Sequence, residues 1–254
     1  MDTAQLTLHG VPGIPLIRPG DDLAVILGDA IARAGLAPGD GDVIVVTQKV
    51  VSKAEGQYVD LAQVMPSERA RELANAVGKD PRLVEVILSE SAEVLRYRPG
   101  ILIVVHRLGM VVANAGVDRS NVEDGDTRVL LLPKNPDGTC AALRQRWQGR
   151  FGVTLGVIVT DSVGRAWRNG VVGIAIGVAG LPPLENLVGT KDLFGRRLEV
   201  TQVGRADQVA AAASLLMGQA AEGLPLVLVR GLRWDPAEAD AGTLIRPRER
   251  DLFR

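Results

Sequence analysis

The sequence predicts a mixed α/β or α+β fold, in which mixed sheets are flanked by helices. Apolar strand-like runs and helix-like segments are interspersed without the regular alternation of a doubly wound sheet. The chain has 254 residues, which is enough for one large domain or two closely joined ones. Hydrophobic residues make up 46% of the chain and aromatic residues only 3%, so we expect a core of Val, Leu, Ile and Ala.

The first half of the chain is expected to open with a Pro- and Gly-rich loop over 10–22. A helix over 22–34 follows, because Asp21 or Asp22 can cap its start. The run VIVVTQKVVSKAEG (43–56) begins as a buried strand and then becomes polar. Beyond it we expect a helix over 67–77, a second helix over 81–90 with an Asp-Pro start, and two strands within 101–116 joined by a turn at Gly109.

The second half contains the remaining expected elements. In order, they are a helix over 139–150, a strand over 155–160, a glycine-rich strand over 170–180, an alternating strand over 196–204, an alanine-rich helix over 206–222 that Gly223 ends, and a buried strand over 225–231. The tail 234–254 is charged and is expected to lie on the surface.

The composition favours a cytoplasmic protein with no nucleic-acid and no membrane partner. The net charge is −1, from 29 basic and 30 acidic residues, so no global field attracts polyanions. The single cysteine, Cys140, excludes an internal disulfide and a thiolate metal cluster, and we expect a passive side chain there. The start of the chain lacks a signal-peptide core, and no apolar run is long enough for a bilayer. His106 lies in an apolar run and is expected to be a packed strand residue.

Three groups of polar residues follow apolar runs. They are Gln48, Lys49, Ser52 and Lys53; Asn114, Asp118, Ser120 and Asn121; and Asp161, Ser162, Arg165, Arg168 and Asn169. The last group lies in VTDSVGRAWRNG (159–170), which is expected to be a loop with an Asn-Gly turn. Loops on a rigid sheet often assemble active sites. We therefore expect these groups to lie close together.

The residue types in these groups indicate a metal–nucleotide site. Carboxylate, hydroxyl and amide oxygens suit Mg²⁺ or Mn²⁺, and nearby lysine and arginine suit phosphate. This combination is typical of phosphoryl transfer. An aspartate after a strand is also a common turn former, and the two arginines could form a solvated face. Neither a Walker-type phosphate loop nor a Gly-x-Gly-x-x-Gly motif is present.

The motifs together resemble the CofE family, the coenzyme F-420-0:L-glutamate ligases, also called γ-glutamyl ligases. The resemblance is carried, in order, by GIPLIRPGDDL, VVTQKVVSKAEG, ANAGVDRSNV, VTDSVGRAWRNG, VGIAIGVAG, KDLFGRRLEVT and AAAASLLMGQAAEGLPLVLVRG. It implies a CofE-like domain over 1–233, two intertwined subdomains within it, and a homodimer with interlocked sheets.

The resemblance also implies a reaction. GTP and divalent cations would drive amide formation between the carboxylate of the phospholactyl deazaflavin F-420-0 and the amine of L-glutamate. Further glutamates would join through γ-linkages. An acyl phosphate intermediate implies GDP and phosphate as products. Two divalent ions, Mg²⁺ or Mn²⁺, are implied, and a potassium requirement is common in the family.

The site residues carried over by motif fall into two sets. The first divalent ion would be held by Asp118 and Asp161, and the second by Ser162 and Gln219. GTP contacts would come from Gly13, Ile14, Pro15 and Leu16; Gln48, Lys49 and Lys53; Asn121; and Met217, Gly218, Gln219, Ala220, Ala221, Glu222, Gly223 and Leu224. Lys49 departs from the family, since many relatives carry a small hydroxyl residue there. By charge alone, Arg165 and Arg168 are expected to face phosphate or the acidic deazaflavin.

Two alternatives remain open from the sequence. The first is a metal-dependent ligase that adds an amino acid to another acidic metabolite. The second is a nucleotide-binding protein without activity, against which the intact metal-ligand residue types speak. No catalytic base and no glutamate-binding residue is assigned.

Overall fold

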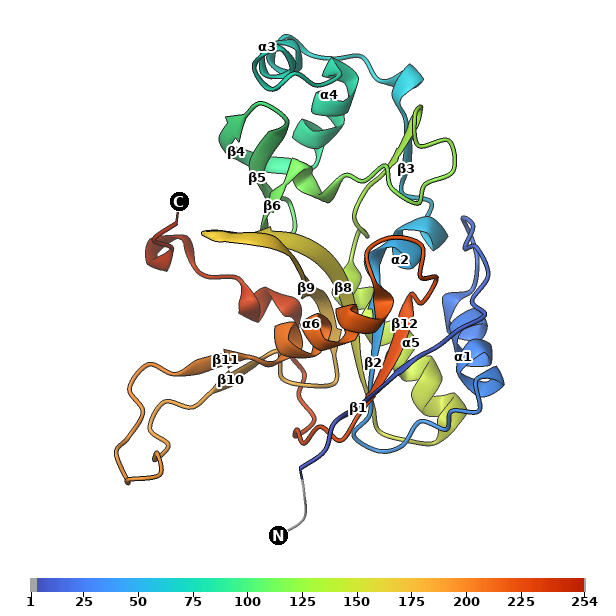
Figure 1. The fold of residues 1–254 in the computed structure, drawn as a ribbon, viewed down its shortest axis with the longest axis vertical. Helices are drawn as coiled ribbons and strands as arrows, with labels where there is room; N and C mark the ends of the chain where they lie inside the picture. The colour runs from blue at the N-terminus through green and yellow to red at the C-terminus, as the bar shows by residue number, and fades with distance from the viewer. Residues whose placement is uncertain (1–3, 254) are drawn as a thin grey trace.

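The computed structural model describes residues 4–253 and confirms the mixed α+β architecture (Figure 1). Its largest sheet has five strands in the order β1-β12-β2-β8-β9. These strands are β1 (Thr7–Gly10), β12 (Leu226–Arg230), β2 (Val43–Thr47), β8 (Gly156–Arg165) and β9 (Arg168–Ala179). Strands β2 and β8 run parallel, and the other neighbours are antiparallel.

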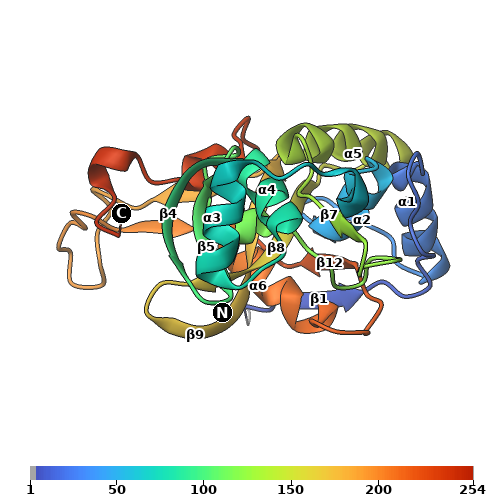
Figure 2. The same cartoon turned by 90° about the horizontal axis from the view of Figure 1, so that it is seen from above.

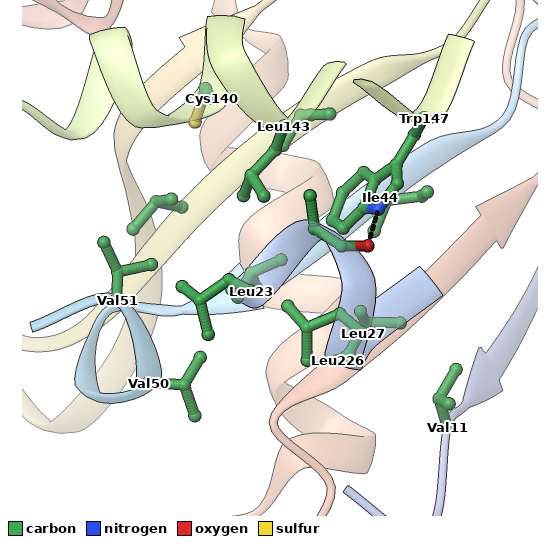
Figure 3. Packing of buried hydrophobic residues seen from close by; sticks show 14 of the residues in the cluster. Val11, Leu23, Leu27, Ile44, Val50, Val51, Cys140, Leu143, Trp147 and Leu226 are labelled. Atoms are coloured by element: carbon green, nitrogen blue, oxygen red, sulfur yellow. Dashed lines mark hydrogen bonds between the residues drawn. The ribbon is translucent and has the colours of Figure 1, made fainter. Parts of the chain in front are cut away.

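Helices cover both faces of this sheet (Figure 2). Helices α1 (Leu23–Arg33) and α5 (Pro136–Phe151) lie on one face, and α6 (Arg205–Met217) lies on the other. Side chains alternate between the two faces of the sheet along β2. Ile44 packs in the hydrophobic core on the α1 and α5 face, and Val45 packs in the core on the α6 face. As Figure 3 shows, the fully buried Trp147 of α5 packs over α1, and its Nε1 donates to the carbonyl of Ala24 over 2.9 Å.

A second cluster of elements lies above the central sheet in Figure 1. Helices α3 (Glu68–Val77) and α4 (Pro81–Ser89) pack on a three-stranded sheet of β4 (Ser91–Arg98), β5 (Ile101–His106) and β6 (Val111–Ala113). The other elements are α2 (Gln48–Ala54), the pair β3 (Tyr58–Asp60) and β7 (Arg128–Leu130), the pair β10 (Leu184–Asn186) and β11 (Gln202–Gly204), and 3₁₀ turns at Leu61–Gln63, Asn114–Gly116, Ala241–Leu244 and Arg248–Arg250. The β10–β11 pair begins an arm that projects from the body (Figure 1).

Capping residues fix two helix starts as expected. The Asp22 carboxylate accepts from the backbone N–H of Val25 at the start of α1, and the Asp80 carboxylate accepts from that of Arg82 at the start of α4. The starts of α1 and α4 agree with the sequence predictions within a residue. Helix α3 ends at Val77, also as expected.

Several boundaries differ from the expectations. Strand β8 continues through Asp161 and Ser162 to Arg165, so these residues lie in a long hairpin rather than in a loop. The turn of that hairpin lies at Trp167, with φ of +62°, and the expected Asn-Gly turn lies inside β9. Helix α6 ends at Met217 rather than 222, because Gly218 adopts φ of +69°.

Other differences concern elements that were missed or shortened. Only Gln202–Gly204 of the expected strand over 196–204 is a strand, and α5 begins at Pro136 rather than 139. The missed elements are β1, α2, β3, β4, β7 and β10.

The C-terminal tail is mostly exposed, as expected, but it has two anchors. The Trp234 indole donates to the carbonyl of Gly41 over 3.0 Å, and Ala241 is buried with its N–H donating to Asp137. Among the helices of residues 4–253, none has the length and apolar character needed to cross a bilayer.

Candidate active site

A cavity of about 820 Å³ brings together segments that are far apart in the sequence. Its walls are the loop before α1, helix α2, the loop that follows Asp118, the middle of β8 and the loop after α6. Most of the residues expected at the site line it: Ile14, Pro15, Leu16, Gln48, Lys49, Lys53, Asp118, Asn121, Asp161, Ser162, Met217, Gly218, Gln219, Ala220, Ala221, Gly223 and Leu224.

Asp118 is held by donors on both of its oxygens. The Lys49 Nζ lies 2.7 Å from Oδ2, and the N–H and hydroxyl of Ser120 both donate to Oδ1 over 2.8 Å. Lys49 also donates to the Ser120 hydroxyl over 2.9 Å. Burial alone would raise the pKa of Asp118, but the hydrogen bonds from Lys49 and Ser120 outweigh it and hold the pKa below its usual value.

Asp161 has the opposite electrostatic character. Burial, together with the charge of Asp118, raises the pKa of Asp161 to about 6, although hydrogen bonds from the Ser162 N–H and the Gln48 side chain favour its ionised form. On β8 it pairs with Ile174 of β9, one residue beyond Thr160, where the pairing of β8 with β2 ends. The cavity therefore holds a carboxylate that is short of positive charge.

Asn121 joins the loop after Asp118 to two other walls. Its backbone is left-handed, with φ of +55°, a conformation that asparagine tolerates better than most residues. Its carbonyl accepts from Lys53 Nζ over 2.7 Å, and its side-chain amide donates to the carbonyl of Ala220 over 3.0 Å. Burial and the nearby Lys49 charge lower the pKa of Lys53.

The loop after α6 is shaped by Gly218 and Glu222. The Glu222 carboxylate folds back to accept from the Ala220 N–H over 2.8 Å, and it lies where a side chain on Gly218 would project. Gln219, Ala220 and Ala221 of this loop line the cavity. Glu222 thus shapes the wall without lining it.

Seven residues of the expected site and of the three polar groups do not line the cavity. The Ser52 hydroxyl donates to Gln48, the Asn114 amide oxygen accepts from the Leu102 N–H, and Asn169 is exposed near the tip of the β8–β9 hairpin. Gly13 and Glu222 lie beside lining residues, whereas Arg165 and Arg168 lie at the exposed tip of the β8–β9 hairpin. There the Arg165 guanidinium donates to the carbonyl of Asn169 over 3.2 Å.

Some lining residues were not expected at the site from the sequence. Arg18 and Glu123 each lie within a few residues of an expected segment, and their charge was the available signal. Tyr58 reaches the cavity from β3, beneath the Arg128 guanidinium at 4.5 Å from its ring centroid, and no sequence pattern marks it. His106 and Cys140 are buried elsewhere, as expected.

Carboxylates, ammonium groups and amides around one cavity are typical of an enzyme site, and similarity to known proteins gives the class of this enzyme as a ligase. The family described as F420-0:Gamma-glutamyl ligase matches residues 13–231. The chain therefore belongs to the F420-0:γ-glutamyl ligase family, whose members are enzymes of coenzyme F420 biosynthesis.

Three curated relatives, each named coenzyme F420:L-glutamate ligase, illustrate the similarity. The protein of Methanothermobacter thermautotrophicus is 46% identical, over 98% of this chain and 99% of its own length. That of Methanopyrus kandleri is 45% identical over 98% of each chain, and that of Archaeoglobus fulgidus is 45% identical over 98% of this chain and 97% of its own.

Proposed function

We propose that this enzyme joins L-glutamate to the phospholactyl deazaflavin F420-0 in a GTP-dependent reaction with an acyl phosphate intermediate. Amide formation comes first, and γ-linked glutamates follow. The single observation that carries the proposal is the convergence of 17 of the expected site residues on one cavity. Family membership supplies the acceptor and the amino acid.

The donor set of the cavity fits a hard divalent cation. Asp118 and Asp161 offer carboxylates, Ser162 offers a hydroxyl and Gln219 offers an amide. All four residues line the same cavity. The raised pKa of Asp161 supports this fit, since a cation beside it would offset the cost of its buried charge. We assign the first Mg²⁺ or Mn²⁺ to Asp118 and Asp161 and the second to Ser162 and Gln219. When bound, the ions would neutralise charge on the transferring phosphoryl group.

The nucleotide assignment rests on two cations and on a wall of backbone groups. Lys49 and Lys53 lie one helical turn apart on α2 and both line the cavity, which suits the phosphates of GTP. The loop over 218–224 also lines the cavity and would offer backbone groups to the nucleotide. Asn121 connects these two walls, so it would fix the distance between them.

The proposed chemistry solves the problem of a poor leaving group. A carboxylate oxygen of F420-0 attacks the γ-phosphorus of GTP, the bond to the β-phosphate oxygen breaks, and GDP leaves. The neutral amine of glutamate then attacks the acyl carbon, and the C–O bond to phosphate breaks as the nitrogen loses its proton. The protein's residues hold both reactants in line and exclude water, which is the main requirement of such a step.

The direct test combines substrate dependence with site variants. Purified enzyme is incubated with GTP, Mn²⁺ and K⁺, with F420-0 and L-glutamate added singly and together. GDP is expected only with both, with a mass gain of one or more glutamyl units. Asp161→Asn should abolish turnover, while Arg69→Gln, on the exposed face of α3, should turn over normally. GDP formation without a glutamylated product would contradict the proposal.

The arginines at the hairpin tip have a separate proposed role. Arg165 lies four residues beyond Asp161, about 13 Å along an extended strand. Only a distant part of a long acceptor would reach it. We assign Arg165 and Arg168 to the acidic part of F420-0, so Arg165→Gln should raise the KM for F420-0 and leave the KM for GTP unchanged.

A homodimer is also proposed. The arm between β10 and β11 carries Leu193 and Phe194, which are 100% and 96% exposed, and a second copy of the chain would cover them. Sedimentation should give twice the chain mass, and Phe194→Ser should weaken that association. A monomer at micromolar concentration would contradict it.

A further inference from the structure

The ammonium of Lys49 occupies the same carboxylate that we assign to a divalent ion. Its Nζ is 2.7 Å from Asp118 Oδ2, and the other oxygen of Asp118 already accepts two hydrogen bonds from Ser120. Both oxygens of the carboxylate are therefore engaged by protein donors. A divalent ion that binds Oδ2 would meet the ammonium at contact distance, and the repulsion between the two cations would disfavour their joint occupancy of this oxygen.

Lys49 is able to move. It lies in the first turn of the short helix α2, and its side chain is 28% exposed. Within residues 4–253, its ammonium contacts Asp118 and Ser120. A lysine ammonium on a flexible four-carbon stem can swing within the cavity without moving the backbone.

The charged side chains that line the cavity indicate which partner the displaced ammonium would take. Three are positive, namely Arg18, Lys49 and Lys53, and three are negative, namely Asp118, Glu123 and Asp161. A divalent ion that enters alone leaves this balanced set with an excess positive charge in a partly enclosed space. A triphosphate that enters with the ion offsets that excess and offers the displaced ammonium a new anion.

We infer that Lys49 is a tethered cation that competes with the divalent ion for Asp118 and thereby couples metal binding to nucleotide binding. With no nucleotide, the ammonium keeps Asp118 and weakens metal binding. With GTP, the ammonium transfers to the phosphates and releases Asp118 to the ion. This inference rests on the proposed metal and nucleotide sites and makes Lys49 a positioning residue.

The test measures Mn²⁺ binding with no nucleotide present. Free Mn²⁺ is followed by electron paramagnetic resonance in a titration of the wild type and of Lys49→Met, which keeps the length of the side chain and removes its charge. We expect Lys49→Met to bind Mn²⁺ at least about tenfold more tightly, since a like charge at contact distance is removed. A general loss of structure would weaken metal binding, so this result cannot come from misfolding.

Two control variants isolate the contact from the charge. Lys49→Arg should bind Mn²⁺ as the wild type does, because the cation at Asp118 is kept. Lys53→Met removes the same charge one turn later, where the ammonium donates to the Asn121 carbonyl instead of a carboxylate. Its Mn²⁺ affinity should change by no more than about threefold, since charges without direct contact are screened.

The coupling itself is measured with a fluorescent GTP analogue. In the wild type, Mn²⁺ should tighten nucleotide binding by a larger factor than in Lys49→Met, where metal and nucleotide no longer exchange a shared cation. Equal factors in the two proteins would overturn the coupling.

The remaining outcomes separate this inference from the proposed function. If the wild type binds Mn²⁺ through Asp161 but Lys49→Met binds it equally or more weakly, the competition is wrong and the metal site stands. If the wild type binds no Mn²⁺ even with GTP, both the metal site and the competition are wrong.

Discussion

Replacing Asp161 by asparagine should stabilise the fold while it abolishes turnover. Burial raises the pKa of this carboxyl from 3.8 to about 6, so the folded state holds the ionised form at a cost. Below pH 3.8 the group is protonated in both the folded and unfolded states, and the cost is absent. Between that pH and about 6, the unfolded chain ionises first, so folding loses stability as the pH rises.

The magnitude follows from the size of the shift. A difference of 6 minus 3.8, at 1.36 kcal/mol per pKa unit, gives a penalty of about 3 kcal/mol above pH 6. Asparagine is nearly the same shape, keeps an oxygen to accept from the Ser162 N–H, and has no charge. The variant should therefore be more stable by up to about 3 kcal/mol at pH 7, and by about 1 kcal/mol at pH 4.5.

Urea unfolding at pH 4.5 and pH 7, in the presence of a chelator, measures this difference. The exposed Asp235→Asn is the matched control and should leave the free energy of unfolding unchanged at both pH values. If Asp161→Asn is equally or less stable than the wild type at pH 7, burial does not destabilise the ionised carboxylate and the reasoning fails.

Three further predictions concern the core. Trp147→Ala should lower the free energy of unfolding by about 3–5 kcal/mol, because a fully buried indole is lost. Gly177→Ala should prevent stable folding, since its Cβ would lie 2.5 Å from the backbone of Pro136. Gly149→Ala is its control on α5, where the new Cβ meets open space, and it should raise the free energy of unfolding by about 0.5–1 kcal/mol in the same urea assay. Burial raises the pKa of the Cys140 thiol, so a maleimide should label it at pH 8 only after unfolding, and rapid native labelling would show that α5 opens.

Local signals in the sequence predicted some elements well. Helices α1 and α4 begin where an aspartate can cap them, and those caps depend only on residues two or three positions apart. The end of α6 was misplaced because two glycines, Gly218 and Gly223, both carry positive φ values. Only the fold decides which of them ends the helix.

Elements that depend on distant partners were harder to predict. Strand β8 continues past Thr160 because β9 pairs with its polar half, and polar residues in a hairpin look like a loop in the sequence. Helix α2 has no side-chain cap from Thr47, so its start carries no local signal. Tyr58 joins the cavity through the β3–β7 pairing, which spans about 70 residues of sequence.

Motifs predicted more of the residues that line the cavity than residue chemistry did. Residue types alone indicated a metal–nucleotide site, and the resemblance to a family supplied the loop over 217–224, which has no charged side chain facing the cavity. The Lys49–Asp118 contact joins residues 69 positions apart and became visible only in the fold.

The most direct measurement follows one oxygen atom. F420-0 labelled with ¹⁸O in its carboxylate is converted with GTP, Mn²⁺ and L-glutamate, and the released phosphate is analysed by mass spectrometry. An acyl phosphate requires one singly ¹⁸O-labelled phosphate for each F420-0 that gains its first glutamate, together with GDP and a glutamylated product. A first glutamate addition that releases no ¹⁸O-labelled phosphate, or that forms GMP with pyrophosphate, would contradict phosphoryl transfer to the carboxylate in this cavity.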